Sequence, residues 1–188
     1  HSASVLYKDK AWLFSGHSGA GKSTHTNMWK ELFNTPVING DLNLIDINTT
    51  DGIPIVIGIP WCGTSGIYTS RSYPLGGITF IKKDITDQVR RIDGDDAVLS
   101  IAQRMISPCW NTRLLENNLA ASEKIAARIT VFRLCCTKNP SSAFLMKEEI
   151  DNEDAWHKAN PSMEFMPILA SQIKKEYLEM QKYLSDSF

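Results

Sequence analysis

The sequence predicts an α/β fold in which a mixed β-sheet carries a phosphate-binding loop and is flanked by helices. Three observations lead to this prediction. Strand-like and helix-like segments alternate along the 188 residues. Residues 42–48 and 53–59 are typical of two strands joined by a tight turn, so part of the sheet is expected to be antiparallel. A glycine-rich turn follows a strand-like segment and leads into a helix-like one.

The first half of the chain is expected to hold most of the strands. The predicted elements are strands over residues 3–7, 11–16 and 37–39, a helix over residues 22–33, the hairpin, and a strand over residues 77–82. A loop over residues 60–74 is rich in Gly, Ser and Thr. It is too long for a simple turn, which makes it a candidate functional loop.

The second half is expected to be mainly helical. The predicted elements are helices over residues 93–106 and 111–127, a strand over residues 129–136, a helix over residues 141–150, and an amphipathic helix over residues 165–184 beyond a polar segment at 151–161. We expect residues 1–150 to form one phosphate-loop domain and residues 151–188 a helical extension of it. The apolar stripe of the last helix can pack on the domain or on a second copy, or dock a target.

Composition narrows the class of protein. With 43% hydrophobic and 22% charged residues, the chain is typical of a folded protein. Its 20 basic and 21 acidic side chains nearly cancel, which argues against nucleic acid as a partner. No apolar run reaches the roughly 20 residues that span a bilayer, and no signal peptide is visible, so a cytoplasmic location away from membranes is expected. The four cysteines show no CxxC spacing and are interpreted as reduced core thiols.

The glycine-rich turn carries the strongest functional signal. Residues 16–23, GHSGAGKS, fit the Walker A pattern G-x-x-x-x-G-K-[ST]. Such a turn points backbone N–H groups at a phosphate, and the following helix adds roughly half a positive charge at its N-terminus. Lys22 is expected to contact the outer phosphates and the Ser23 hydroxyl to join a Mg²⁺ coordination shell. The predicted nucleotide-binding residues are Gly16, Ser18, Gly19, Ala20, Gly21, Lys22, Ser23 and Thr24.

A phosphoryl-transfer site also needs a carboxylate near the terminal phosphate. Asp41 follows the strand predicted at residues 37–39, and Gly40 beside it allows a close backbone approach. Because the carboxyl ends of parallel strands meet at one edge of a sheet, we expect Asp41 to face the glycine turn. There it could bind the metal or accept a proton, although an aspartate after a strand can also simply cap a turn.

These residues resemble the HPr kinase/phosphorylase type of P-loop kinase, which shares its core with phosphoenolpyruvate carboxykinase. The resemblance covers about residues 1–150 and rests on His1 before a strand pair, GHSGAGKST at residues 16–24, Asn39-Gly40-Asp41, the hairpin and loop, and VFRLCCTKNPSS at residues 131–142. It implies that ATP and Mg²⁺ are used to phosphorylate a serine hydroxyl. It further implies that Asp41 acts as the base and that His1 lies near the phosphates. The family usually has paired acids where this chain has one.

Several other side chains are candidates with an ordinary alternative. Arg71 could stabilise the transferring phosphoryl group, or it could be a surface residue of its loop. Trp61 and Cys62 could shape an acceptor pocket or simply pack. His17 and His25 flank the glycine turn, and His17 could face the nucleotide or, equally, the solvent.

Three functions are compatible with these residues. The first is a kinase that uses ATP and Mg²⁺ to phosphorylate a hydroxyl of a protein or small molecule, with Lys22, Asp41 and Arg71 as catalytic residues and Ser23 and Asp41 as metal ligands. The second is a nucleotide-binding regulatory module without efficient transfer. The presence of a single acid at the strand end is compatible with this function. The third, a carboxykinase, is disfavoured because the chain lacks a visible second set of metal ligands.

Overall fold

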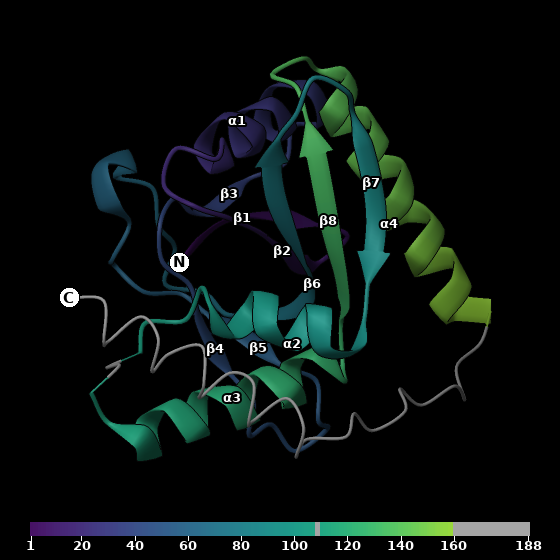
Figure 1. Cartoon of the computed structure of the whole chain (residues 1–188). Coiled ribbons are helices and arrows are strands. Elements are labelled where there is room, and N and C mark those ends of the chain that lie inside the picture. Colours follow the sequence, from purple (N-terminus) through teal and green to yellow (C-terminus); the bar gives the residue numbers. More distant parts are fainter. Residues whose placement is uncertain (108–109, 160–188) are drawn as a thin grey trace.

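The computed structural model describes residues 1–107 and 110–159 and has the expected α/β architecture, a mixed sheet flanked by helices (Figure 1). Eight strands of this part of the chain form one sheet. The helix predicted over residues 165–184 and one of the cysteines, Cys109, lie outside the described residues.

The first strands form around a tight turn. β1 (Ser2–Tyr7) and β2 (Lys10–Ser15) pair in antiparallel fashion. Lys8 and Asp9 between them both have positive φ, 51° and 59°, as a two-residue hairpin turn requires. After the glycine turn, α1 (Lys22–Phe33) ends at Asn34 in the left-handed conformation. These elements therefore match the predicted ones.

The order of the strands brings four strand ends to one edge. The remaining members of the sheet's path are β3 (Val37–Asn39), β4 (Leu44–Asp46), β5 (Ile55–Ile57) and β6 (Tyr73–Lys83), in the order β3-β1-β2-β6-β5-β4. β6 runs parallel to β2 and to β8 (Thr130–Cys136). β1 is antiparallel to both β2 and β3, so β3 runs in the direction of β2. β2, β3, β6 and β8 thus end on the same edge, and β1 separates β3 from β2.

Two neighbouring elements between residues 88 and 106 differ from the prediction. The sequence pattern does not predict β7 (Gln88–Ile92), which pairs with β8 in the opposite direction, as the arrows in Figure 1 show. Its Arg90 and Arg91 are exposed, which hides the strand pattern. α2 (Gly94–Ala102) ends before residue 106, because a tighter turn follows in which Arg104 N–H donates to the Ile101 carbonyl.

The last described helix is longer than predicted. α4 (Ser141–Ala159) continues past the predicted end at residue 150 into the polar segment that begins at residue 151. Asp151 explains the continuation, since it accepts a hydrogen bond from the Tyr7 hydroxyl at 2.8 Å and pairs with Lys147 one turn back at 2.7 Å. These bonds tie the second half of α4 to β1.

Helices cover both faces of the sheet. One core cluster contains Phe14, Trp29 and Ile150 and lies between the sheet and the helices α1 and α4. The other contains Leu13, Ile101 and Leu119 and lies beneath α2 and α3 (Thr112–Ala126), which lie side by side in Figure 1. The alternation along β2 sends neighbouring side chains to opposite faces. α3 is capped at its start by Asn111, whose side chain accepts from Leu114 N–H at 3.1 Å.

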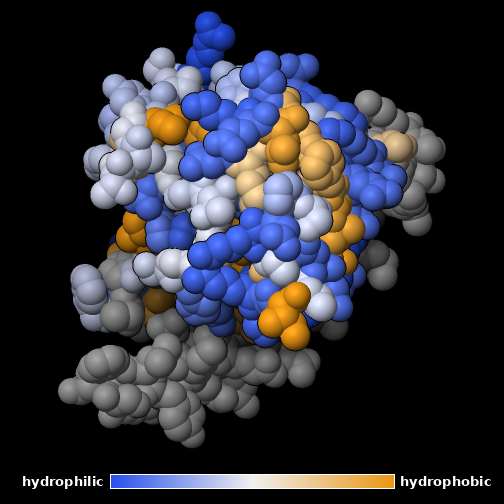
Figure 2. All heavy atoms as spheres, turned by 90° about the horizontal axis from the view of Figure 1, so that it is seen from above, coloured by the Kyte–Doolittle hydropathy of each residue, from blue (hydrophilic) through white to orange (hydrophobic). Residues whose placement is uncertain are grey.

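The face seen in Figure 2 is mainly hydrophilic, with hydrophobic groups between the polar ones. In the described part of the chain, no helix has both the length and the apolar character that crossing a membrane requires. Cys62, Cys135 and Cys136 are free, and burial raises the pKa of the Cys136 thiol to about 11.

Candidate functional site

The glycine turn lies between β2 and α1 and has the backbone of an anion cradle. Gly16, Gly19 and Gly21 have φ angles of 149°, 72° and 109°, which L side chains rarely adopt. A Cβ at Gly16 would also lie 2.8 Å from the Ile81 carbonyl oxygen of β6. The turn is closed by the Ala20 N–H, which donates to the His17 carbonyl at 3.1 Å.

The start of α1 leaves donors for an anion. Gly21 occupies the N-cap position, and no side chain caps the helix there. The first turn of a helix has N–H groups without partners inside the helix, together with the positive end of the helix dipole. This helix start can therefore bind a phosphate through its backbone.

Lys22 is folded against the turn that it follows. Its Nζ donates to the carbonyl oxygens of Gly16 and His17 at 3.4 and 3.3 Å, and the residue is buried. Burial lowers the pKa of Lys22 from its ordinary value; the charge of Asp41 acts in the opposite direction, and that of Arg104 lowers it further. Two cations thus face one carboxylate beside the turn, an arrangement that an anion would stabilise.

Asp41 lies beyond β3 and is anchored to the start of β1. Ser2 N–H donates to the Asp41 backbone carbonyl at 2.9 Å. The side chain is half-exposed, and its Oδ1 lies 2.9 Å from the His1 Nε2. The structure therefore brings His1, which the resemblance implies to be near the phosphates, to the predicted base.

Asn39 holds the turn that carries Asp41. Its Oδ1 accepts from the N–H groups of Asp41 and Leu42 at 2.9 and 3.1 Å. Its Nδ2 donates to the carbonyl oxygens of Ile59 and Trp61 at 3.2 and 3.0 Å. This side chain makes four hydrogen bonds and is only 3% exposed, so it stabilises the turn and positions Asp41.

A polar hollow joins Asp41 to the start of α1. It has a volume of about 300 Å³, and its lining includes Ser23, Asp41, Thr64 and Ser65. We call it the Ser23–Asp41 hollow. The short 3₁₀ helix η1 (Gly63–Ser65) closes it, and a Cβ at Gly63 would lie 2.8 Å from the Asp41 carboxylate. A side chain at position 63 would therefore collide with this carboxylate, and only glycine avoids the collision.

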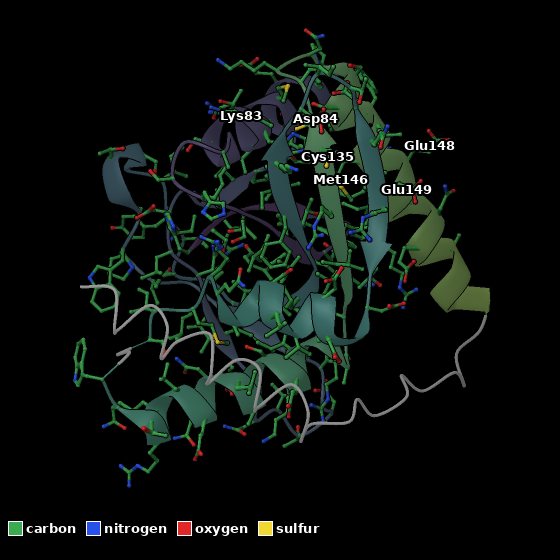
Figure 3. The ribbon with its side chains drawn as sticks, in the orientation of Figure 1. Lys83, Asp84, Cys135, Met146, Glu148 and Glu149 are labelled. Carbon is green, nitrogen blue, oxygen red and sulfur yellow. The ribbon has the colours of Figure 1, made fainter. Side chains whose placement is uncertain are left out.

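A second hollow lies on the other side of the glycine turn. It measures about 390 Å³ and extends from Gly19, Gly21 and Thr24 to the ends of β6 and β8, at Asp84 and Lys138. We call it the β6–β8 hollow. Figure 3 shows Lys83 and Asp84 at the end of β6, on the side of α1.

The predicted histidines differ in their surroundings. His17 is exposed, whereas His25 is buried with its Nε2 accepting from the Trp29 indole at 3.1 Å. Burial lowers the pKa of His25 to about 4, so its ring is neutral near pH 7. The exposure of His17 agrees with its solvent-facing interpretation.

Arg104 is the site residue that sequence reasoning missed. It follows α2, its Nη2 lies 3.2 Å from the His17 Nε2, and its carbonyl accepts from the His1 backbone nitrogen at 2.9 Å. It belongs to no motif, so only the packing of α2 against the sheet reveals it.

The remaining candidates lie further from this group. Arg71 is exposed at the end of its loop, and it lines neither the Ser23–Asp41 hollow nor the β6–β8 hollow. Trp61 is 69% exposed, and Cys62 lines the Ser23–Asp41 hollow. The proposed part of Arg71 in the chemistry remains a prediction.

The oxygen atoms present suit a magnesium ion that is bound together with phosphate. The Ser23 hydroxyl and the Asp41 carboxylate line the same hollow, and both are ligands of the hard type that Mg²⁺ prefers. Within residues 1–107 and 110–159, no group of three or more His, Cys, Asp or Glu side chains could hold a metal by itself. The residues therefore fit a metal whose shell is shared with phosphate oxygens and water.

The sequence matches no protein-family model and no curated protein. Among solved structures, the chain is similar to one described as the Hpr(Ser) kinase/phosphatase from Coxiella burnetii. The identity is 7% and the TM-score 0.44, and the match covers 85% of this chain and 96% of that chain. A likeness of this size is too weak to support a function.

Proposed function

We propose that the protein is a kinase that uses ATP and Mg²⁺ to phosphorylate a hydroxyl group. The observation that supports this most directly is the position of Asp41, which lines one hollow together with Ser23 at the start of α1. A phosphate cradle alone would suit any nucleotide-binding protein. A carboxylate beside that cradle supplies the base that transfer to a hydroxyl requires.

The two hollows suggest how ATP would lie. The β6–β8 hollow would take the nucleoside, and the amides of residues 16–24 would bind the phosphates with Lys22 on the outer ones. The terminal phosphate would then face the Ser23–Asp41 hollow, where Ser23 and Asp41 would hold Mg²⁺. When bound, the ion would supply neutralisation of the phosphate charge.

Asp41 would accept the proton of the attacking hydroxyl, and His1 would orient its carboxylate. Arg104 and, as the sequence suggests, Arg71 are the cations available to stabilise charge on the transferring group. We further propose that residues 1–150 form the transfer domain and residues 151–188 its extension, with α4 spanning the division between them. Chemically this is the HPr kinase-like reaction, with serine as one acceptor type.

A second candidate is a regulatory module that binds the nucleotide without efficient transfer. One observation favours it: Asp41 is the one acidic residue in the lining of the Ser23–Asp41 hollow, and its carboxylate contacts His1. The measurement of transfer separates the two candidates, since both require nucleotide binding.

Titration calorimetry with Mg²⁺-ATP tests the proposal first. We expect binding, and we expect Lys22→Ala to weaken it by roughly 100-fold, the effect of losing a charge-assisted contact to phosphate. Lys30→Ala, an exposed lysine on the same helix, is the matched control and should bind as the native protein does. Release of γ-labelled phosphate to water or to added hydroxyl compounds then measures transfer. Absence of nucleotide binding would overturn the proposal.

A further inference from the structure

A third and larger hollow opens beside the phosphate site. It has a volume of about 430 Å³, within the range of roughly 300 to 1,000 Å³ typical of small-molecule sites. It extends from the start of β1 and the end of β2 past β6 to β4 and the turn after α2. β4 and α2 lie in the lower half of Figure 1. We call it the apolar cavity.

Most of the walls of this cavity are hydrophobic, both in its buried part and at its opening. Leu13, Ile78 and Phe80 form buried parts of its lining. Leu44, Trp61 and Ile106 also line it, although they are 51%, 69% and 74% exposed. Large apolar side chains that gather around an opening mark a surface that an apolar group covers.

The polar side chains of the lining are already bonded to the protein. Asn43 donates to the Ser2 carbonyl at 2.6 Å and accepts from the Ser4 hydroxyl at 2.7 Å. The Ser15 hydroxyl donates to the His1 carbonyl at 2.8 Å, and Asn118 donates to the Ile106 carbonyl at 3.4 Å. A peptide backbone placed in the cavity would lose water without gaining these partners, at a cost of roughly 1–3 kcal/mol per unpaired group. An occupant without amide groups avoids that cost.

The charged residues of the lining lie at the end nearest the phosphate turn. They are His1, whose ring contacts Asp41, and Arg104, whose guanidinium contacts His17. Most of the cavity is thus lined by apolar side chains, and at one end it reaches His1, whose ring contacts the proposed base Asp41. Its occupant should be apolar with one polar end.

We propose that the acceptor is a small, mainly apolar alcohol whose carbon skeleton fills the apolar cavity and whose hydroxyl reaches Asp41. This inference rests on the proposed kinase function and names its substrate class. In the reaction the alcohol oxygen forms a bond to the γ-phosphorus of ATP, and the bond from that phosphorus to the β,γ-bridging oxygen breaks. The hydroxyl proton passes to the Asp41 carboxylate, and the products are an alkyl phosphate and ADP.

Straight-chain primary alcohols from ethanol to 1-decanol provide the test, with γ-labelled Mg²⁺-ATP as donor. Each added methylene should raise kcat/KM for transfer by up to roughly fourfold until the cavity is filled, as expected for burial of a CH₂ group. Short serine peptides should be poorer acceptors than 1-octanol. A kcat/KM that does not change with chain length, or a serine peptide that exceeds 1-octanol, would overturn the inference.

Two exposed isoleucines give a matched pair of variants. Ile106→Asp places a charge on the cavity rim and should lower transfer to 1-octanol by at least roughly tenfold while ATP binding is retained. Ile85→Asp, at a position that is 91% exposed and does not line the cavity, should behave as the native protein. Ile106→Ala should also lower transfer to 1-octanol, but to a smaller extent. Because alanine adds no charge, this variant tests the same position if Ile106→Asp does not fold. Equal transfer to 1-octanol by Ile106→Asp and Ile85→Asp would contradict the inference.

Failure of this inference is distinguishable from failure of the proposed function. If labelled phosphate passes from ATP to water or to a serine peptide but not to 1-octanol, the kinase function stands and the apolar acceptor is wrong. If the protein transfers phosphate to none of these, both are wrong.

Discussion

The His1 Nε2 lies 2.9 Å from the Asp41 Oδ1, so the strand that begins at the edge of the site and the turn after β3 meet through these two side chains. Both are partly exposed, at 40% and 46% of their side-chain surface. An exposed pair adds little to stability. Its value lies in fixing one oxygen of the carboxylate and leaving the other for a substrate or metal.

Replacement of Asp41 should separate binding from chemistry. We expect Asp41→Asn to reduce phosphate transfer by roughly 100-fold or more, since an amide cannot accept the proton, a step that contributes roughly 10²–10⁴-fold in catalysis. Binding of Mg²⁺-ATP should fall far less. His1→Gln should lower kcat with a smaller effect on KM and alter the pH profile of transfer, because its part is to orient the carboxylate. An Asp41→Asn protein with native transfer would show that another group is the base.

Asn39 is predicted to be intolerant of replacement by an acid. In Asn39→Asp, a carboxylate would face the Ile59 and Trp61 carbonyl oxygens to which the amide now donates. Loss of two buried bonds and repulsion between acceptors should destabilise the protein by roughly 2–4 kcal/mol. Urea unfolding of both proteins measures this. A variant of native stability and raised activity would instead mean that the position can serve as a second metal ligand.

The glycines around η1 offer a test of the space that Asp41 needs. Gly63 and Gly66 both have positive φ, 57° and 66°, so alanine is strained to a similar degree at each. A Cβ at Gly63 would meet the Asp41 carboxylate, whereas one at Gly66 has no atom within 4 Å. Gly63→Ala should therefore reduce transfer by at least roughly tenfold more than Gly66→Ala, with nucleotide binding similar in both. Equal losses in transfer would assign the effect to backbone strain alone.

The phosphate turn, the strands around it and Asp41 can be anticipated because each depends on a local pattern. The glycines of residues 16–21 must adopt positive φ, and the apolar runs on either side leave few alternatives to a strand and a helix. The direction of β3 follows from the usual position of ligands at the carboxyl edge of a sheet. The position of β1 between β3 and β2 cannot be inferred in this way, because strand order depends on pairing between distant segments.

The features that escape sequence reasoning depend on tertiary contacts. Arg104 reaches His17 across 87 positions of sequence, and no local pattern marks it. α4 passes the expected end at Ile150 because Asp151 bonds to Tyr7 and Lys147, a gain that helix propensity does not include. β7 lacks the alternation of a half-buried strand, because the consecutive residues Arg90 and Arg91 are both exposed.

The two candidate arginines can be ranked by substitution. Arg104 contacts the glycine turn through His17 and lowers the pKa of Lys22 through its charge, whereas Arg71 is exposed. We expect Arg104→Gln to lower transfer by roughly 10- to 100-fold and Arg71→Gln to lower it less. Steady-state transfer assays on both variants decide the order. A larger loss in Arg71→Gln would mean that the loop carries the arginine of the reaction.

The stability of the protein should fall in mild acid because of His25. Its pKa is lowered by burial from 6.5 to about 4, and the nearby charge of Asp87 only partly opposes this. Between pH 6.5 and 4 the unfolded chain therefore binds a proton at His25 that the folded protein excludes. The free energy of unfolding should decrease as the pH falls through this window, by up to about 1.4 kcal/mol per pH unit from this one group.

The variant His25→Gln isolates that contribution, since glutamine can still accept a hydrogen bond from the Trp29 indole but does not titrate. Urea unfolding of both proteins at several pH values from about 7.5 down to about 4.5 gives two curves against pH. Carboxylates such as Asp87 titrate in both proteins, so the difference between the curves reports His25. We expect the native protein to be favoured at the upper end of this range and its advantage to shrink as the pH falls. Parallel curves would show that His25 binds a proton in the folded state as easily as in the unfolded one. The conclusion that its ring is buried and neutral beside Trp29 would then be wrong.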